Sequence, residues 1–160
     1  MDRKIDDLAR QTVTLATEKK IMIGFAESLT GGMISSEIVS VPGASACLEG
    51  SVVSYSNEVK MSILGVQEDV IRNFGAVSEL CAKQMASGAR KALDCDMAVS
   101  VTGIAGPAGG TDLKPVGTVY IGFSSEEKCY AEHFVFEGSR EDIRTATVEN
   151  ALSILLQNMK

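Results

Sequence analysis

Hydroxyl-bearing residues follow several apolar stretches of this sequence, in a pattern that could bring them together in one catalytic site. Ser28 follows the first stretch, Ser54 and Tyr55 the second, and Thr102 the third. If these stretches are parallel strands, their carboxyl ends lie along one edge of a sheet, where open α/β sheets bind their ligands. The pattern therefore predicts a shared site at that edge. Taken alone, each hydroxyl is equally typical of a helix cap or a turn.

A serine nucleophile requires a base, and the sequence offers two candidates. The single histidine, His133, lies in a predicted strand far from the hydroxyl residues, and it is typical of an exposed or hydrogen-bonded strand position. Lys60 is predicted near the start of a helix that Asn57 would cap. The positive end of the helix dipole and burial would both favour the neutral amine that a general base requires. A solvated helix lysine is the alternative interpretation.

Two arginines lie one helical turn apart at the start of the last predicted helix. Arg140 and Arg144 could bind a phosphate or a carboxylate, because a guanidinium matches the geometry of both groups. They could equally form an exposed set of ion pairs with the neighbouring acidic residues Glu137, Glu141 and Asp142.

The glycine-rich segments match none of the common nucleotide-binding or hydrolase motifs. The loop at residues 103–110 lacks the Gly-Lys-Ser/Thr ending of a phosphate loop, and no Gly-x-Gly-x-x-Gly opens a helix after a strand. The residues around Ser28 also lack the flanking glycines of the hydrolase nucleophile elbow. Glu27 is interpreted as a polar structural group.

The elements that must position these residues alternate between strands and helices. Apolar runs predict strands at residues 21–26, 52–55 and 97–101 and an antiparallel hairpin at 116–123 and 129–136. Helical periodicity predicts helices near residues 5–16, 33–41 and 57–64, a short one that ends at Gly75, another capped by Ser78, and a last one capped by Ser139. This order predicts an α/β fold with a mixed sheet, in a single domain over residues 1–160.

Composition limits the partners and the compartment. Lys and Arg number 15 against 21 Asp and Glu, and this net charge of −6 disfavours nucleic acid and anionic membranes as partners. One histidine excludes a multi-histidine metal site, and the four cysteines lack the paired spacing of zinc ligands. We expect buried, reduced thiols. No apolar run approaches the roughly 20 residues that span a bilayer, so we expect a soluble cytoplasmic protein with no membrane partner.

Several segments together resemble the CinA C-terminal domain family. They are residues 26–32, 55–60, 75–79, 102–107 and 114–119, and the resemblance extends in order over essentially the whole chain. It implies a compact α/β domain with a layered mixed sheet and helices on both faces. Members of this family include the nicotinamide-nucleotide amidase. The resemblance therefore implies a hydrolase of a linear amide bond, which converts nicotinamide mononucleotide to nicotinate mononucleotide and ammonia.

The resemblance also implies roles for individual residues. Ser28 is similar to the family's nucleophile and Lys60 to its base, as a Ser–Lys dyad. Tyr55 would assist the dyad or orient the substrate, Thr102 lies at the family's position beside the reaction centre, and Arg140 corresponds to the substrate-binding arginine. The glycine-bearing loops would contact the substrate and the oxyanion, through Thr30, Gly31, Gly32, Gly103 and Gly106.

Two positions depart from the family pattern: Leu29 stands where many relatives carry Cys, and Ser139 where many carry Asp. Neither change removes a group that the chemistry needs, although Ser139 could alter how Arg140 is oriented. The resemblance requires no metal and no organic cofactor. It also suggests a homo-oligomer.

Two other functions remain open from the sequence. One is a non-catalytic nucleotide-binding domain connected with competence or DNA damage, as the family name suggests. The other keeps the Ser28–Lys60 dyad but acts on a different amide or an ester.

Overall fold

A five-stranded mixed sheet with the strand order β2-β1-β3-β4-β5 forms the centre of the molecule. In this computed structural model, which describes residues 2–160, β1 pairs in parallel with β2 and with β3, and β4 runs antiparallel to both β3 and β5. The strands are β1 (Ile23–Glu27), β2 (Leu48–Val53), β3 (Met97–Gly103), β4 (Thr118–Ser124) and β5 (Cys129–Val135).

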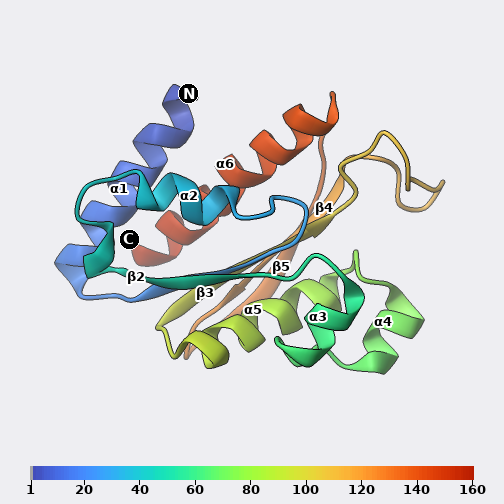
Figure 1. Cartoon of the computed structure of the whole chain (residues 1–160), viewed down its shortest axis with the longest axis horizontal. Helices are drawn as coiled ribbons and strands as arrows, with labels where there is room; N and C mark the ends of the chain where they lie inside the picture. The colour runs from blue at the N-terminus through green and yellow to red at the C-terminus, as the bar shows by residue number, and fades with distance from the viewer. Residues whose placement is uncertain (1) are drawn as a thin grey trace.

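Helices cover both faces of this sheet (Figure 1). One face carries α1 (Arg3–Lys19), α2 (Met33–Val39) and α6 (Arg140–Met159). The other carries α3 (Asn57–Ser62), α4 (Glu68–Phe74) and α5 (Glu79–Leu93), and a short 3-10 helix at Ala44–Ala46 precedes β2. The predicted α/β fold, with a mixed sheet between two layers of helices, is confirmed.

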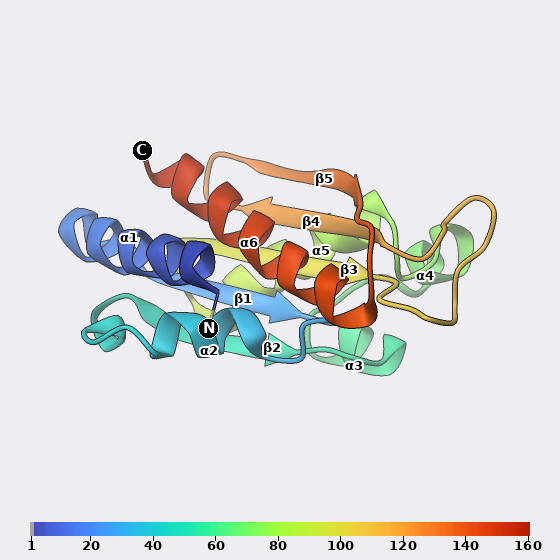
Figure 2. The same cartoon turned by 90° about the horizontal axis from the view of Figure 1, so that it is seen from above.

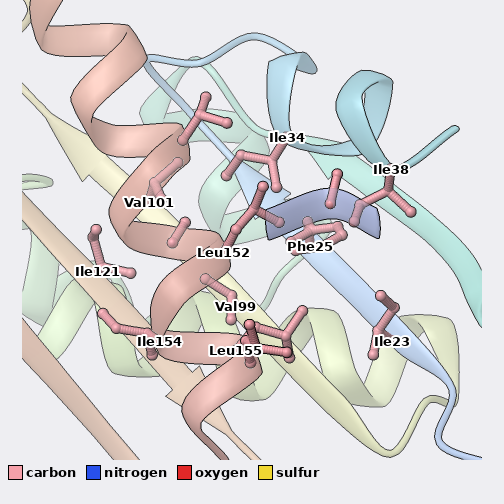
Figure 3. Packing of buried hydrophobic residues seen from close by; sticks show 14 of the residues in the cluster. Ile23, Phe25, Ile34, Ile38, Val99, Val101, Ile121, Leu152, Ile154 and Leu155 are labelled. Atoms are coloured by element: carbon pink, nitrogen blue, oxygen red, sulfur yellow. The ribbon is translucent and has the colours of Figure 1, made fainter. Parts of the chain in front are cut away.

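The larger hydrophobic core lies between the sheet and the helices α1, α2 and α6 (Figure 3). Phe25 of β1 and Val99 of β3 are fully buried in it, in one cluster with Ile34 of α2 and with Leu152 and Leu155 of α6. Burying a side chain of this size stabilises a fold by about 1.5–3 kcal/mol. The two central strands are therefore held firmly against α2 and α6.

Small residues on the opposite face of the sheet allow α5 to approach closely. Ala26 and Ala98 face the second core cluster, in which α5 takes part. A Cβ at Gly122 would come within 2.4 Å of the Ala82 carbonyl oxygen of α5, so only glycine fits at this contact. The Ser100 hydroxyl donates to the same carbonyl at 2.6 Å. Strands β1 and β3 are thus covered on both faces up to their carboxyl ends.

Most predicted caps are confirmed, with one correction. Ser78 and Ser139 cap α5 and α6, and Ser139 forms a capping box with Asp142. The cap of α3 is Ser56 rather than the predicted Asn57, because the Ser56 hydroxyl accepts the Val59 backbone N–H at 3.2 Å.

The second strand also differs from the prediction, since it begins at Leu48 rather than at Val52. Its early residues include Glu49 and Gly50, which hide the strand in the sequence. As the edge strand of the sheet, β2 is only partly buried, so it lacks a continuous apolar run.

Three of the four free cysteines are buried as expected, whereas Cys129 is exposed because it begins the edge strand β5. Within residues 2–160, no helix combines the length and the apolar character needed to cross a membrane.

Candidate active site

The carboxyl ends of the three parallel strands meet at one edge of the sheet, as the sequence pattern predicts. The Ser28 backbone N–H donates to the Val101 carbonyl at 3.2 Å, and the Ser54 N–H donates to the Glu27 carbonyl at 2.8 Å. These bonds continue the ladder beyond the strand ends. Ser28, Ser54 and Thr102 are all buried at this edge.

A cavity of about 260 Å³ opens at this edge of the sheet. Its lining includes many of the residues singled out in the sequence, namely Ser28, Tyr55, Lys60, Thr102, Gly103 and Arg140. Leu29 and Asn57 also contribute to its walls. The turn after strand β1, helix α3, strand β3 and helix α6 therefore all bring side chains to one small space.

Lys60 is the most unusual group in this cavity, because its side chain is buried and, within residues 2–160, has no acidic partner. The residue is 2% exposed, and its Nζ lies 3.0 Å from Ser28 Oγ. Its other hydrogen bonds go to the carbonyl oxygens of Ser54 at 2.8 Å and Tyr55 at 3.1 Å. Burial lowers the pKa of Lys60 below its usual value of 10.5.

The three neighbours of Lys60 Nζ suit a neutral amine. A neutral amine has two N–H donors and one lone pair. The two donors match the carbonyls of Ser54 and Tyr55, which leaves the lone pair facing the hydroxyl of Ser28. The Ser28 hydroxyl can then donate its proton to Lys60, as nucleophile activation by a general base requires.

Tyr55 and Thr102 differ in how they meet the cavity. The Tyr55 side chain is largely exposed, with the residue 65% accessible, and Lys60 contacts its backbone carbonyl. The Thr102 side chain is buried, and its hydroxyl donates to the Ala76 carbonyl at 2.8 Å. Thr102 therefore holds the wall formed by Ala76 and Val77, and its oxygen can still accept a hydrogen bond.

Glu27 is fully buried and organises the turn that follows Ser28. Its carboxylate accepts five hydrogen bonds, from the hydroxyls of Thr30, Ser35 and Ser51 and from the backbone N–H groups of Ile34 and Ser35. The prediction of a polar structural group is confirmed. The start of α2 does not offer the N–H groups of Ile34 and Ser35 to a ligand, because both donate to Glu27.

The predicted glycine positions shape the loops around the cavity. Gly31 and Gly32 have φ angles of +60° and +107°, which allow a tight left-handed turn, and they lie outside the cavity lining together with Thr30. Gly103 lines the cavity, and a Cβ there would come within 2.8 Å of the Thr118 carbonyl oxygen. The Gly106 carbonyl accepts a hydrogen bond from Arg140.

The two arginines of α6 diverge to different partners. Arg140 lines the cavity, and its Nη1 donates to the Gly106 carbonyl at 2.6 Å. Arg144 donates from Nε to the Leu29 carbonyl at 2.8 Å and from Nη2 to the Thr30 carbonyl at 3.1 Å. Among the described residues, neither arginine forms an ion pair with an acidic neighbour. Sequence reasoning identified the pair but could not separate these two roles.

His133 lies away from this site, on β5. It is exposed, and its ring stacks on Tyr120 with 4.6 Å between ring centroids. The prediction of a strand histidine is confirmed, and Lys60 is the basic side chain that contacts Ser28.

Comparison with protein-family models finds a match to the CinA C-terminal domain over residues 5–159. A CinA-like protein of Endomicrobium trichonymphae is 50% identical over 154 residues, which cover 96% of this chain and 36% of that protein. A CinA-like protein of Thermotoga neapolitana is 46% identical over 159 residues, which cover 99% of this chain and 38% of that protein. The chain thus spans little more than a third of these relatives.

Solved structures show the same fold. A competence/damage inducible protein from Agrobacterium tumefaciens superposes with a TM-score of 0.96 at 38% identity, covering 98% of this chain and 96% of that one. A competence-damaged protein superfamily member from Escherichia coli gives a TM-score of 0.93 at 30% identity, and the match covers 99% of this chain and 92% of that one.

Proposed function

This chain belongs to the CinA C-terminal domain family, and from that premise we propose that it is an amidase acting on nicotinamide mononucleotide through a Ser28–Lys60 dyad. The observation that carries the proposal is the buried Lys60 Nζ, which lies 3.0 Å from Ser28 Oγ and pairs with no acidic side chain among the described residues. A lysine that only stabilised the fold would be expected to pair with a carboxylate or to reach solvent.

In the first half of the reaction, Ser28 Oγ attacks the carboxamide carbon while its proton moves to Lys60 Nζ. A tetrahedral intermediate forms, with negative charge on the former carbonyl oxygen. Lys60 then donates a proton to the departing nitrogen as the C–N bond breaks, and ammonia leaves. The product of this half is an ester between Ser28 and the nicotinoyl group.

In the second half, a water molecule hydrolyses this ester. Lys60, neutral again after ammonia has left, accepts a proton from the water as the water oxygen attacks the ester carbon. The tetrahedral intermediate collapses, and Lys60 returns the proton to Ser28 Oγ. Nicotinate mononucleotide is released, and the dyad regains its starting protonation state.

The Leu29 backbone N–H is our candidate donor to the oxyanion. Leu29 directly follows the nucleophile and lines the cavity, and its N–H has no hydrogen-bond partner among residues 2–160. A backbone donor fixed beside the reacting carbon stabilises the oxyanion without reorganising, and a single such donor contributes about 10²- to 10³-fold to kcat.

Arg140 is our candidate for holding the phosphate of the substrate. In the part of the chain that the structure describes, the Arg140 guanidinium donates only from Nη1, to the Gly106 carbonyl, so it retains further N–H groups for an anion. Because the chain carries a net charge of −6, an anionic substrate needs such a local cation. The exposed Tyr55 ring can cover the positively charged nicotinamide ring, a contact that aromatic faces favour.

Ammonia release from nicotinamide mononucleotide, compared with release from nicotinamide riboside, tests this proposal. The riboside keeps the amide and lacks the phosphate, so we expect its kcat/KM to be lower by about 10²-fold. Binding of the nucleotide without ammonia release would contradict the proposal and favour the non-catalytic alternative. Equal rates with both compounds, or faster release from an unrelated amide, would contradict the assigned substrate.

A further inference from the structure

Two charged side chains, Glu27 and Arg144, form hydrogen bonds with the turn that carries Ser28. Glu27 accepts hydrogen bonds from the donors of the turn and of α2, including the Thr30 hydroxyl. Arg144, which lies far along the chain in α6, donates to the carbonyls of Leu29 and Thr30. Among residues 2–160, the hydrogen bonds of the Arg144 guanidinium go to these two carbonyls, and Arg144 lies outside the cavity lining.

Resting on the proposed function, we propose that Arg144 is a positioning residue that orients the peptide groups after Ser28, so that the Leu29 N–H faces the oxyanion. In a trans peptide unit, the C=O and the N–H point in opposite directions. The Thr30 carbonyl accepts from Arg144 and from the Met33 N–H, each at 3.1 Å, and the N–H of the same peptide unit, that of Gly31, donates to the Ser28 carbonyl at 3.1 Å.

The bond from Gly31 fixes the next peptide unit in turn. Because the Ser28 carbonyl is directed at Gly31, the Leu29 N–H of that unit points the opposite way. Arg144 Nε also holds the Leu29 carbonyl, which keeps this acceptor turned toward α6. A carbonyl that rotated toward the reacting carbon would instead repel the oxyanion.

The two glycines of the turn make such a constraint necessary. Gly31 and Gly32 both have positive φ angles, and glycine is the residue with the most conformational freedom. A planar guanidinium can bind two adjacent carbonyls in a fixed geometry, whereas a lysine ammonium has no planar fork. The guanidinium of Arg144 therefore holds the two carbonyls that directly precede Gly31.

The test compares Arg144→Met with Arg140→Met, two variants that remove the same group one helical turn apart. For Arg144→Met we expect kcat on nicotinamide mononucleotide to fall about 30-fold with KM within about threefold, since the lost effect acts on the transition state. For Arg140→Met we expect mainly a rise in KM. Arg144→Lys should recover only a small part of the lost kcat.

If Arg144 served only to stabilise the fold, kcat of the folded variant would not respond to a small guanidinium compound. With Arg144→Ala, we expect methylguanidinium to restore kcat at least fivefold, without the same effect on the wild type or on Arg140→Ala. An unchanged kcat in Arg144→Met, or a rise in KM alone, would overturn the inference. So would a complete failure of rescue in a variant whose melting temperature matches the wild type.

Failure of the inference is distinguishable from failure of the proposed function. If the wild type releases no ammonia from the nucleotide, the proposed function fails. The role of Arg144 is then measured by the rate at which 4-nitrophenyl acetate acylates Ser28, a reaction that needs the oxyanion donor but no phosphate. Equal acylation rates in the wild type and Arg144→Met would overturn the inference on this substrate as well.

Discussion

The turn after β1 and the loop after β3 both reach the cavity, but they are built in opposite ways. Residues 28–30 are buried, and Glu27 and Arg144 hold this turn through charged hydrogen bonds. The loop at residues 104–117 projects from the body of the molecule (Figure 2), and its residue Leu113 is 94% exposed.

This difference suits the two segments to different tasks in catalysis. A nucleophile and an oxyanion donor must be held within a fraction of an ångström, which suits a turn restrained on both sides. A loop that meets a substrate at the rim of the cavity can be more exposed. Helix α6 connects the turn and the loop. Its Arg140 donates to Gly106 of the loop, and the same helix carries Arg144, which holds the turn.

The largest effect is expected at Lys60, which contacts the restrained turn directly. Lys60→Met removes the proton acceptor while keeping a buried side chain of similar length, so we expect kcat to fall about 10³-fold. Steady-state ammonia release measures this change. The exposed Lys128→Met serves as a matched control, with wild-type kcat expected. Activity above a tenth of the wild type in Lys60→Met would show that another group serves as the base.

Glu27→Gln is expected to have the next largest effect, because it damages the other restraint on the turn. The new amide NH2 would face the N–H and hydroxyl donors that Glu27 now accepts, and we expect a loss of about 2–4 kcal/mol in the free energy of unfolding. Urea denaturation measures it. Glu58→Gln, on an exposed position of α3, should change stability by less than about 0.5 kcal/mol. Similar values for the two variants would contradict the role assigned to Glu27.

The pH dependence should come from Lys60 rather than from the loop. Because the neutral amine is the active form, kcat/KM should fall about tenfold per pH unit below the lowered pKa of Lys60. This acid limb should persist in Leu113→Ser. A profile that is flat across the acidic range down to the limit of folding would contradict a lysine base.

Stability provides an independent check on the same group. The folded state lowers the pKa of Lys60, so between that pKa and the usual 10.5 the unfolded chain binds more protons than the folded protein. The wild type should therefore gain stability relative to Lys60→Met as the pH rises through this window. Below the window both states are protonated, and the cost of burying the charge is fully present. The opposite slope in urea denaturation would contradict the lowered pKa.

The smallest effect is expected at Leu113, in the exposed loop. Leu113→Ser removes an apolar side chain that is almost entirely in solvent, so we expect kcat within about twofold of the wild type and stability within about 0.5 kcal/mol. Ammonia release and thermal unfolding measure the two quantities. A large loss of activity would show that this loop contributes to the site as directly as the turn after β1.

The sequence predicts those parts of the site whose position is determined by local patterns. Ser28, Lys60 and Thr102 meet because each is anchored by an element that its own neighbours determine, such as the buried strand before Ser28. The burial of α5 likewise follows a local pattern, because its buried residues recur at helical spacing.

The features that sequence analysis missed depend on contacts between distant segments. Nothing near Arg144 indicates that it binds the carbonyls of Leu29 and Thr30, more than 100 residues away. The occupation of the α2 amides by Glu27 also follows only from the packing of α2 beside β1. The adjacent glycines 31 and 32 were the one local sign of a turn that needs restraint.

Ammonia release from nicotinamide mononucleotide by the wild type and by Ser28→Ala tests the central claim most directly. The account predicts sustained release by the wild type and a loss of at least about 10³-fold in Ser28→Ala, since covalent catalysis then has no nucleophile. A wild-type rate that survives in Ser28→Ala would contradict the account.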